Sequence, residues 1–470
     1  MSRSKKLLLL LGVLAVVCVA TFCVSLYQEH KEQIKTSDQI ILEIPEDSVT
    51  ALSWTYEGQS LAFHKDEVWY YDEDETFPVD EDAISALLEG FQSFGVSFII
   101  EEVEDYGQYG LDDPVCTIQL TTEDASYEIQ LGDFSTMDSQ RYVSIGDGNV
   151  YLVQQDPLDA FDVELSDLIA NDSLPYVDTA DQLSIQGEDS LQITWQEEGA
   201  SYREEDHYFV TVDGEAQPLD TGLVEDFLYT LSSLDLTEYM TYNVGEDDLA
   251  TYGLDDPERT ITLDYTTQDE DGNETAHTVS LAVSRAPAER WDDTQADAET
   301  ETGEEEEVTA YARVDDSPII YKITTQEYRA LMDASYDTLR HKEILPADLE
   351  NVSQVDVTLD GTSYTVTASG EEEERTWSYG EQELENSDLP DALQALTADS
   401  FTQEEPTGQE EISFTLHLSL EGEPTVSIQF CRYDGTCCLA VVDGQPTALV
   451  PRSQVVDLQE AVYAVVLGES

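Results

Sequence analysis

The sequence predicts an α+β fold in which an N-terminal transmembrane helix is followed by three repeated units. Two observations support this prediction. The phrase Tyr-Gly-Leu-Asp-Asp-Pro occurs twice, at residues 109–114 and 252–257, and one apolar helical stripe occurs three times. Identical phrases far apart in one chain indicate an internal repeat. Each unit is expected to contain an antiparallel meander, a helix, further hairpins and a closing helix.

Length and charge limit the class of protein. The 470 residues suffice for about three domains at roughly 150 residues each. Asp and Glu number 103 against 19 Lys and Arg, a formal charge of -84, which excludes nucleic acid as a natural partner because phosphates would be repelled. A hydrophobic fraction of 40% indicates a folded chain and not a disordered one.

The N-terminus predicts a membrane anchor. Leu7 to Leu26 is an apolar run long enough to cross a bilayer, and Arg3, Lys5 and Lys6 before it favour a cytoplasmic N-terminus. Residues 1–27 would form a cytoplasmic tip and single-pass anchor, residues 28–47 a stalk, and the bulk of the chain would be extracytoplasmic. A cleaved signal peptide is the alternative, although the run is long for one and no clear A-x-A site follows.

The repeated phrase predicts a joint between a helical turn and a strand. The glycine suits the left-handed position after a helix end, the leucine would pack back onto the last turn at Tyr106 or Leu249, and the second aspartate is held extended by the following proline. The proline suits the first position of a strand. The residues assigned to this structural motif are Tyr109, Gly110, Leu111, Asp113 and Pro114, and Tyr252, Gly253, Leu254, Asp256 and Pro257. Ligand binding by their carboxylates is the alternative.

The three units are expected at residues 48–172, 180–345 and 350–468, with an acidic disordered loop at 290–307 in the second. Each contains apolar residues at i, i+3, i+4 and i+7, which predicts an amphipathic helix. These residues are Ile84, Leu87, Leu88 and Phe91; Val224, Phe227, Leu228 and Leu231; and Leu389, Ala392, Leu393 and Leu396. The third unit is divergent, because only Thr407-Gly408 stands where the phrase would be.

Closing helices are predicted from Pro157 to about Ile169, from Thr325 as a helix cap to about Leu339, and from Ser453 to about Val466. Near the last of these, a two-residue turn at Asp434-Gly435 would pair Cys431 with Cys438 across a hairpin. A disulfide between these cysteines is left open, because a hydrogen-bonded pair holds the Cα atoms farther apart.

No catalytic, cofactor-binding or metal-binding residue is predicted. Nucleotide-binding, zinc-protease and serine-hydrolase motifs are missing, and the six histidines are singletons, namely His30, His64, His207, His277, His341 and His417. The pairs Asp112-Asp113 and Asp255-Asp256 could serve glycoside hydrolysis, but adjacent residues of an extended chain point to opposite sides. Residues 269–273 resemble an incomplete calcium loop, and a hairpin turn is the simpler interpretation.

The two phrases, together with Arg141-Tyr142-Val143 and Val150-Tyr151-Leu152-Val153, resemble the bacterial family of domain of unknown function 4340. The resemblance covers residues 48–345 well and the third unit weakly. It implies a membrane-anchored extracytoplasmic protein with no established activity. Some relatives look like accessory parts of ABC-type transport systems, which implies a role in the cell envelope with a protein partner.

We therefore expect a non-catalytic, membrane-anchored scaffold or binding protein, for example an accessory subunit of an ABC-type transport or cell-envelope system. Two alternatives are an extracellular hydrolase that uses carboxylates and a calcium-stabilised adhesion protein. The sequence offers no support for calcium beyond the incomplete loop at residues 269–273.

Overall fold

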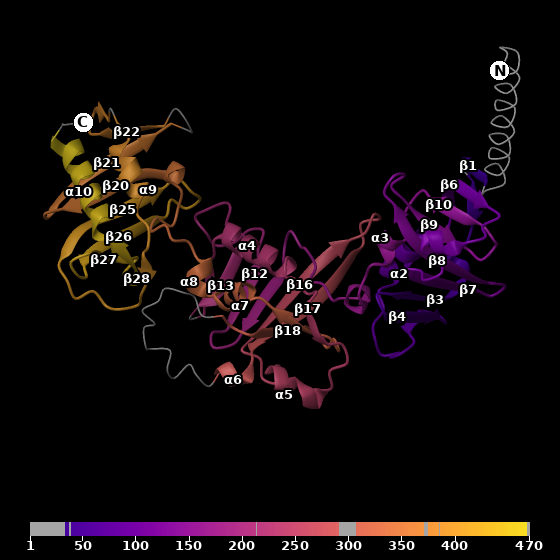
Figure 1. The fold of residues 1–470 in the computed structure, drawn as a ribbon. Helices are drawn as coiled ribbons and strands as arrows, with labels where there is room; N and C mark the ends of the chain where they lie inside the picture. Colours follow the sequence, from indigo (N-terminus) through magenta and orange to yellow (C-terminus); the bar gives the residue numbers. More distant parts are fainter. Residues whose placement is uncertain are drawn as a thin grey trace, which may run out of the picture. The chain divides into compact units, whose positions relative to one another are not determined.

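The computed structural model describes residues 33–36, 39–212, 214–290, 307–370, 375–384 and 386–467 (Figure 1). The chain forms two compact units, Met1–Asp172 with Thr241–Asn243, and Ser173–Met240 with Val244–Ser470. The first unit contains one large sheet, and the second contains two. The strand pairings whose register the structure describes are antiparallel.

The first sheet has ten strands. Nine of them follow one another across the sheet, and β2 (Ile40–Leu42) pairs with β6 beside that path. The order is β1 (Gln33–Thr36), β6 (Phe94–Glu101), β10 (Val150–Val153), β9 (Gln140–Ser144), β8 (Ser126–Ser135), β7 (Cys116–Thr122), β3 (Val49–Tyr56), β4 (Gln59–Lys65) and β5 (Trp69–Tyr71).

The second and third sheets have nine strands each. The second runs β14 (Glu215–Pro218), β13 (Tyr208–Val212), β12 (Leu191–Trp195), β11 (Gln182–Gln186), β16 (Arg259–Gln268), β17 (Glu274–Arg285), β18 (Ala310–Val314), β19 (Ile320–Ile323) and β15 (Tyr239–Thr241). The third runs β23 (Gln382–Glu383), β22 (Thr376–Tyr379), β21 (Thr362–Ser369), β20 (Val352–Leu359), β25 (Glu410–Leu418), β26 (Thr425–Arg432), β27 (Cys437–Val442), β28 (Gln445–Pro451) and β24 (Ser400–Phe401).

The three sheets share one topology. In each, the strand after the joint position (β7, β16 or β25) lies between the first strand of the meander (β3, β11 or β20) and the next strand along the chain (β8, β17 or β26). In each, the strand after the amphipathic helix (β6, β15 or β24) pairs with the last strand before the closing helix (β10, β19 or β28). The predicted threefold repeat is confirmed, and each repeat, consisting of one sheet with its helices, is called a module below. The divergent third module keeps the full strand order.

The amphipathic helices lie where the stripes predict them. They are α2 (Glu81–Glu89), α4 (Thr221–Ser232) and α9 (Asp388–Gln394), and all stripe residues are buried except Ala392, which is half-buried. Asp80 and Asp220 begin the first two by accepting hydrogen bonds from first-turn backbone N–H groups. Each helix packs against the closing helices of its own module, α2 on α3, α4 on α7 and α8, and α9 on α10 (Figure 1).

Two of the three closing helices differ from the prediction. The first is broken into α3 (Leu158–Phe161) and the 3₁₀ turn η3 (Leu165–Leu168), because Asp162 leaves the helical conformation and Glu164 starts a new turn in a capping box with Asp167. The second is broken into α7 (Thr325–Met332) and α8 (Tyr336–Leu339). Here Ser335 forms a new capping box, and the cap of α7 is Thr324, not Thr325. The third, α10 (Arg452–Leu467), is continuous as predicted.

The predicted pairing of Cys431 with Cys438 is wrong by one residue. Cys431 lies opposite Leu439, and Arg432 lies opposite Cys438. The reason is a longer turn, in which the Asp434 side chain accepts hydrogen bonds from the backbone of Thr436 and Cys437. Cys116, Cys431, Cys437 and Cys438 are all free thiols.

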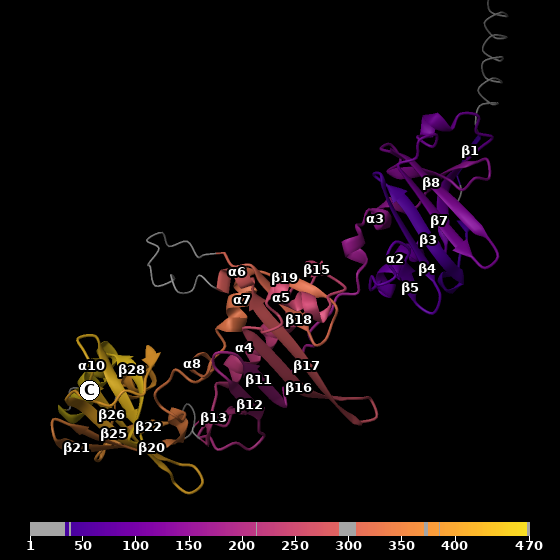
Figure 2. The same ribbon diagram turned by 90° about the horizontal axis from the view of Figure 1, so that it is seen from below.

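The remaining short elements are α5 (Leu249–Tyr252), α6 (Pro287–Arg290), η1 (Glu46–Ser48), η2 (Tyr106–Tyr109), η4 (Glu246–Asp248) and η6 (Leu349–Asn351). The hairpin of β16 and β17 extends past its neighbouring strands (Figure 2). Its turn is formed by residues 269–273, where the Asp269 carboxylate accepts from the backbone of Asp271 and Asn273. The hairpin interpretation of this segment is confirmed.

Within the described residues, no helix combines the length and the apolar character that crossing a membrane requires. The predicted transmembrane segment, Leu7 to Leu26, lies outside the described residues, as does most of the predicted acidic loop, at 291–306.

Candidate functional site

The first Tyr-Gly-Leu phrase closes a helical turn. The Asp105 side chain begins η2 by accepting from the Gly107 N–H at 3.1 Å, and the turn ends at Gly110, whose φ is 71°. The Gly110 N–H donates to the Gly107 carbonyl and the Leu111 N–H donates to the Tyr106 carbonyl at 3.1 Å, which together form a Schellman cap. Leu111 is buried in a small apolar cluster, and Tyr106 packs against this cluster.

The second phrase repeats this geometry. Helix α5 ends at Gly253, whose φ is again 71°. The Gly253 N–H donates to the Ala250 carbonyl, and the Leu254 N–H donates to the Leu249 carbonyl at 3.1 Å. Leu254 is buried, so both leucines turn into their modules. The predicted left-handed glycine is confirmed in both copies.

Both glycines sit against the same position of the neighbouring hairpin strand. A Cβ on Gly110 would lie 2.9 Å from the backbone nitrogen of Asp133, and a Cβ on Gly253 would lie 3.0 Å from the carbonyl oxygen of Arg285. Asp133 and Arg285 are equivalent, because each lies two residues after the strand residue that faces the first residue of β7 or β16. These approaches require glycine for reasons of space as well as of φ.

The tyrosines of the phrase are also in equivalent surroundings. Tyr109 lies against Tyr142 with ring centroids 4.9 Å apart, and Tyr252 lies against Tyr311 at 5.1 Å. Tyr142 and Tyr311 occupy the same position of β9 and β18, as the register of their sheets shows. The two phrases therefore make the same contacts in two modules.

The remaining motif residues lie at the surface or beside the strand. Asp112, Asp113, Asp255 and Asp256 are all exposed, and in the described part of the chain none of them belongs to a group of side chains that could hold a metal ion. Pro114 and Pro257 lie two residues before the first residues of β7 and β16, so they do not take the predicted first position of the strand. Val115, between Pro114 and β7, already donates its N–H to the Leu131 carbonyl.

The third module has lost the helical turn at this place. Between β24 and β25, a stretch described throughout, the chain forms no helix before the strand. Gly408 instead passes so close to β26 that a Cβ would lie 1.7 Å from the carbonyl oxygen of Arg432. Gly408 is required because the Arg432 backbone leaves no room for a Cβ atom, and not because of a positive φ.

The second module has an ionic network beside its joint. Glu258 accepts from the Arg285 guanidinium at 2.7 Å, from the Arg285 backbone N–H at 2.7 Å and from the Tyr328 hydroxyl at 3.0 Å. Burial raises the pKa of Glu258, but the hydrogen bonds from Arg285 and Tyr328 outweigh it and hold this pKa below its usual value. The carboxylate is therefore structural and ionised at neutral pH.

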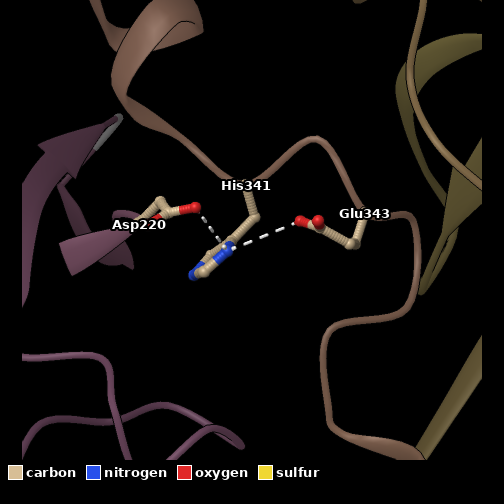
Figure 3. A group of neighbouring side chains, drawn as sticks. All are labelled: Asp220, His341 and Glu343. Atoms are coloured by element: carbon tan, nitrogen blue, oxygen red, sulfur yellow. Dashed lines mark ion pairs between the residues drawn. The ribbon is translucent and has the colours of Figure 1, made fainter. Parts of the chain in front are cut away.

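A different set of side chains forms the candidate site. His341, in the connector of residues 340–348 between α8 and η6, places its Nε2 atom 2.7 Å from Asp206 Oδ1. Its Nδ1 atom faces Asp220 Oδ2 at 3.6 Å and Glu343 Oε2 at 3.7 Å (Figure 3). Asp220 is held in place at the start of α4, where its N–H donates to the Leu339 carbonyl.

Asp206 is the buried member of this group, with a side chain that is 2% exposed. Its second oxygen accepts from the Ser201 hydroxyl at 2.5 Å. Because this hydroxyl bonds to the carboxylate and not to the imidazole, His341 does not act as a base on Ser201. The arrangement is suited to holding an imidazole in one orientation, and it does not provide an activated serine.

A cavity of about 610 Å³ adjoins this site and shares Glu343 with it. Its walls come from Arg203 and from the connector and α9, including Leu345, Asp348 and Gln394. Arg203 donates to the Leu345 carbonyl at 2.8 Å and pairs with Asp348 at 3.5 Å. The connector is thus bound to the loop between β12 and β13 by both Arg203 and His341.

Sequence reasoning placed His341 among six unrelated histidines and did not find this group. Asp206 and Asp220 precede it by more than a hundred positions, so no short spacing connects them. Two local signals were not recognised: His341 and Glu343 are two residues apart, and Asp220 stands just before the apolar stripe of the second helix, a position typical of a helix cap.

A family model described as Domain of unknown function (DUF4340) matches residues 69–207 and 210–412, more than half of the chain. The match extends into the third module, where the phrase is lost. No curated protein and no solved structure matches the chain.

Proposed function

The chain belongs to the DUF4340 family, and from this premise we propose that it is a non-catalytic scaffold or binding protein of the cell envelope. The observation that carries the proposal is the equivalence of the two Tyr-Gly-Leu phrases. Their glycines, leucines and tyrosines make the same internal contacts, and their aspartates are exposed. Residues repeated for their packing are typical of a modular architecture, and not of an active site.

A carboxylate-dependent hydrolase would need two carboxyl groups that face one cleft about 5 to 10 Å apart. The four motif aspartates are exposed, and none of them lines the cavity beside His341. The half-buried Glu258 already accepts hydrogen bonds from Arg285 and Tyr328. These observations favour the scaffold over the hydrolase.

The proposed location follows from the N-terminal sequence. Leu7 to Leu26 would anchor the chain in the cell membrane as a single-pass helix with a cytoplasmic N-terminus, and the three modules would lie outside. The large negative charge suits a solvated surface that repels other copies of the chain. An accessory role beside an ABC-type transport system is the form of scaffold that we propose.

Crosslinking in the native membrane tests this proposal. The full-length chain, tagged at its C-terminus, would be crosslinked in intact cells, purified in detergent and analysed by mass spectrometry. We expect a membrane-protein partner in comparable amount, recovered equally with a variant in which Asp112, Asp113, Asp255 and Asp256 are changed to Asn. Recovery of the chain alone, or a hydrolytic activity that this variant loses, would contradict the proposal.

A further inference from the structure

We propose that Asp220, His341 and Glu343 bind one divalent transition-metal cation of the zinc class, with Asp206 as the residue that orients His341. This proposal goes beyond the scaffold function, because it assigns a ligand to a place that the repeated phrase does not touch. The three donor atoms lie within 4.8 Å of one another. They come from the start of α4 and from the connector after α8 (Figure 3).

The first argument is the tautomer of His341. An ionised carboxylate only accepts hydrogen bonds, so the 2.7 Å contact with Asp206 places a proton on Nε2. The Nδ1 atom then faces the carboxylates of Asp220 and Glu343 at 3.6 and 3.7 Å, where neither oxygen is close enough to accept a hydrogen bond from it. Within this group Nδ1 therefore has no hydrogen-bond partner, and a cation placed between the three atoms would bind all of them.

The second argument is distance. Separations of 3.6 and 3.7 Å from Nδ1 to the two carboxylate oxygens are too long for hydrogen bonds. Zinc binds nitrogen and oxygen at about 2.0 to 2.2 Å, which places neighbouring ligands of a tetrahedral site about 3.4 Å apart. The three donor atoms now lie within 4.8 Å of one another, and rotation of the Glu343 side chain, which is 45% exposed, would bring them to this spacing.

The third argument is the orienting carboxylate. A histidine that binds a metal commonly donates its other N–H to a buried carboxylate, which fixes the ring and raises the basicity of the ligand nitrogen. Asp206, with its second oxygen satisfied by Ser201, is in that position. Three carboxylates around one imidazole also leave an excess of negative charge that a divalent cation would neutralise.

The donor set defines the class of cation. One imidazole nitrogen and two carboxylate oxygens suit zinc and its neighbours among the transition metals, whereas calcium takes six to eight oxygen ligands. Three protein ligands would leave a fourth position for water. A bound cation would fasten the connector to the start of α4 and stabilise the folded second module.

The chain provides matched control sites. His417 contacts Asp356 at 2.7 Å and His64 contacts Asp72 at 2.6 Å, both at the surface. Among the described residues, neither histidine belongs to a group that could hold a metal. His417→Ala therefore removes a comparable His–Asp pair without touching the proposed ligands.

Calorimetric titration of zinc into the chelator-treated full-length chain in detergent tests the proposal. High salt and excess magnesium would suppress diffuse binding to the acidic surface. We expect one tight zinc per chain, lost in His341→Ala and Glu343→Gln, and retained in His417→Ala. Asp206→Asn should weaken it by about 10- to 100-fold, the usual effect of removing an orienting carboxylate.

Glu343→Gln changes an exposed side chain and keeps its shape, so this variant is expected to fold even if His341→Ala does not. Circular dichroism in the absence of zinc checks that it does. Lack of a tight stoichiometric site in the natural chain would overturn the proposal. So would full zinc affinity in the folded Glu343→Gln variant together with an unchanged affinity in Asp206→Asn.

Discussion

Tyr252 lies edge-on against Tyr311 with ring centroids 5.1 Å apart, and this contact is the second copy of one that Tyr109 makes with Tyr142 at 4.9 Å. In both modules the tyrosine is the residue before the left-handed glycine. The ring contact therefore holds the end of the helical turn, just before the next strand begins, against the sheet. In these two modules the pair of rings connects the helical turn to the sheet.

Replacing the buried tyrosine tests the strength of this contact. Tyr109 is 8% exposed, and Tyr109→Ala should lower the free energy of unfolding of the first module by about 3 to 5 kcal/mol, as large aromatic truncations do. Met137→Ala, at a side chain of the same module that is 91% exposed, should change this free energy by less than about 0.5 kcal/mol. Urea unfolding of the two variants measures the difference, and equal midpoints would contradict the assigned role of Tyr109.

The buried ion pair of the first module should be sensitive to the loss of one partner. Arg141 meets Asp156 at 2.7 Å with both side chains about one tenth exposed, and also donates to the Gly132 carbonyl. Arg141→Met leaves Asp156 buried without its cation and should cost about 3 to 5 kcal/mol. Lys322→Met removes an exposed pair with Glu238 and should cost less than about 1 kcal/mol. Chemical denaturation distinguishes these outcomes, and similar losses would contradict the burial argument.

Acid should destabilise the second module through Glu258. Its pKa is lower in the folded chain than the ordinary value of 4.5, so its contribution to stability is present above pH 4.5 and is lost as the pH falls through the folded pKa. Melting temperatures measured through this range should fall less steeply for Glu258→Gln, which is already destabilised at neutral pH. Glu274→Gln, at an exposed residue, serves as the control. A melting temperature that falls as steeply with pH in Glu258→Gln as in the natural chain would contradict the assignment.

The buried thiols should resist alkylation. Burial raises the pKa of Cys116 to about 12, and burial together with the Glu411 carboxylate raises that of Cys438 to about 12, so both remain protonated. Cys437, which is half-buried, should label first with iodoacetamide, and Cys116 and Cys438 only after denaturation. Peptide mapping by mass spectrometry follows the order. Labelling of Cys116 as fast as Cys437 in the native chain would contradict the prediction.

Local chemistry made the joints and the helices predictable. A glycine after a turn, a leucine that packs back and a proline before a strand each act within a few residues, and so does the spacing of Ile84, Leu87 and Leu88 on one helix face. It was harder to predict that a new helix cap would form inside a predicted helix and interrupt it. Ser335 and Glu164 begin new turns because their side chains satisfy local N–H groups, and this interrupts the closing helices.

The rest depends on contacts between distant residues. Strands β6, β15 and β24 were not predicted, because they form by pairing with strands that follow about 50 to 80 residues later, and β24 has only two residues. The register of Cys431 depended on one aspartate side chain in the turn. The site at His341 is assembled from a loop, a helix cap and a connector, so topology alone brings its residues together.

The most direct test of the account compares two variants of the full-length chain by equilibrium unfolding. In one, Gly110 and Gly253 are changed to Ala; in the other, Asp112, Asp113, Asp255 and Asp256 are changed to Asn. If the repeated phrase serves architecture, the glycine variant should lose at least about 1 to 2 kcal/mol at each joint, and more from the close backbone contacts. The aspartate variant should keep its stability. Full stability of the glycine variant, together with a loss of stability in the aspartate variant, would contradict the account.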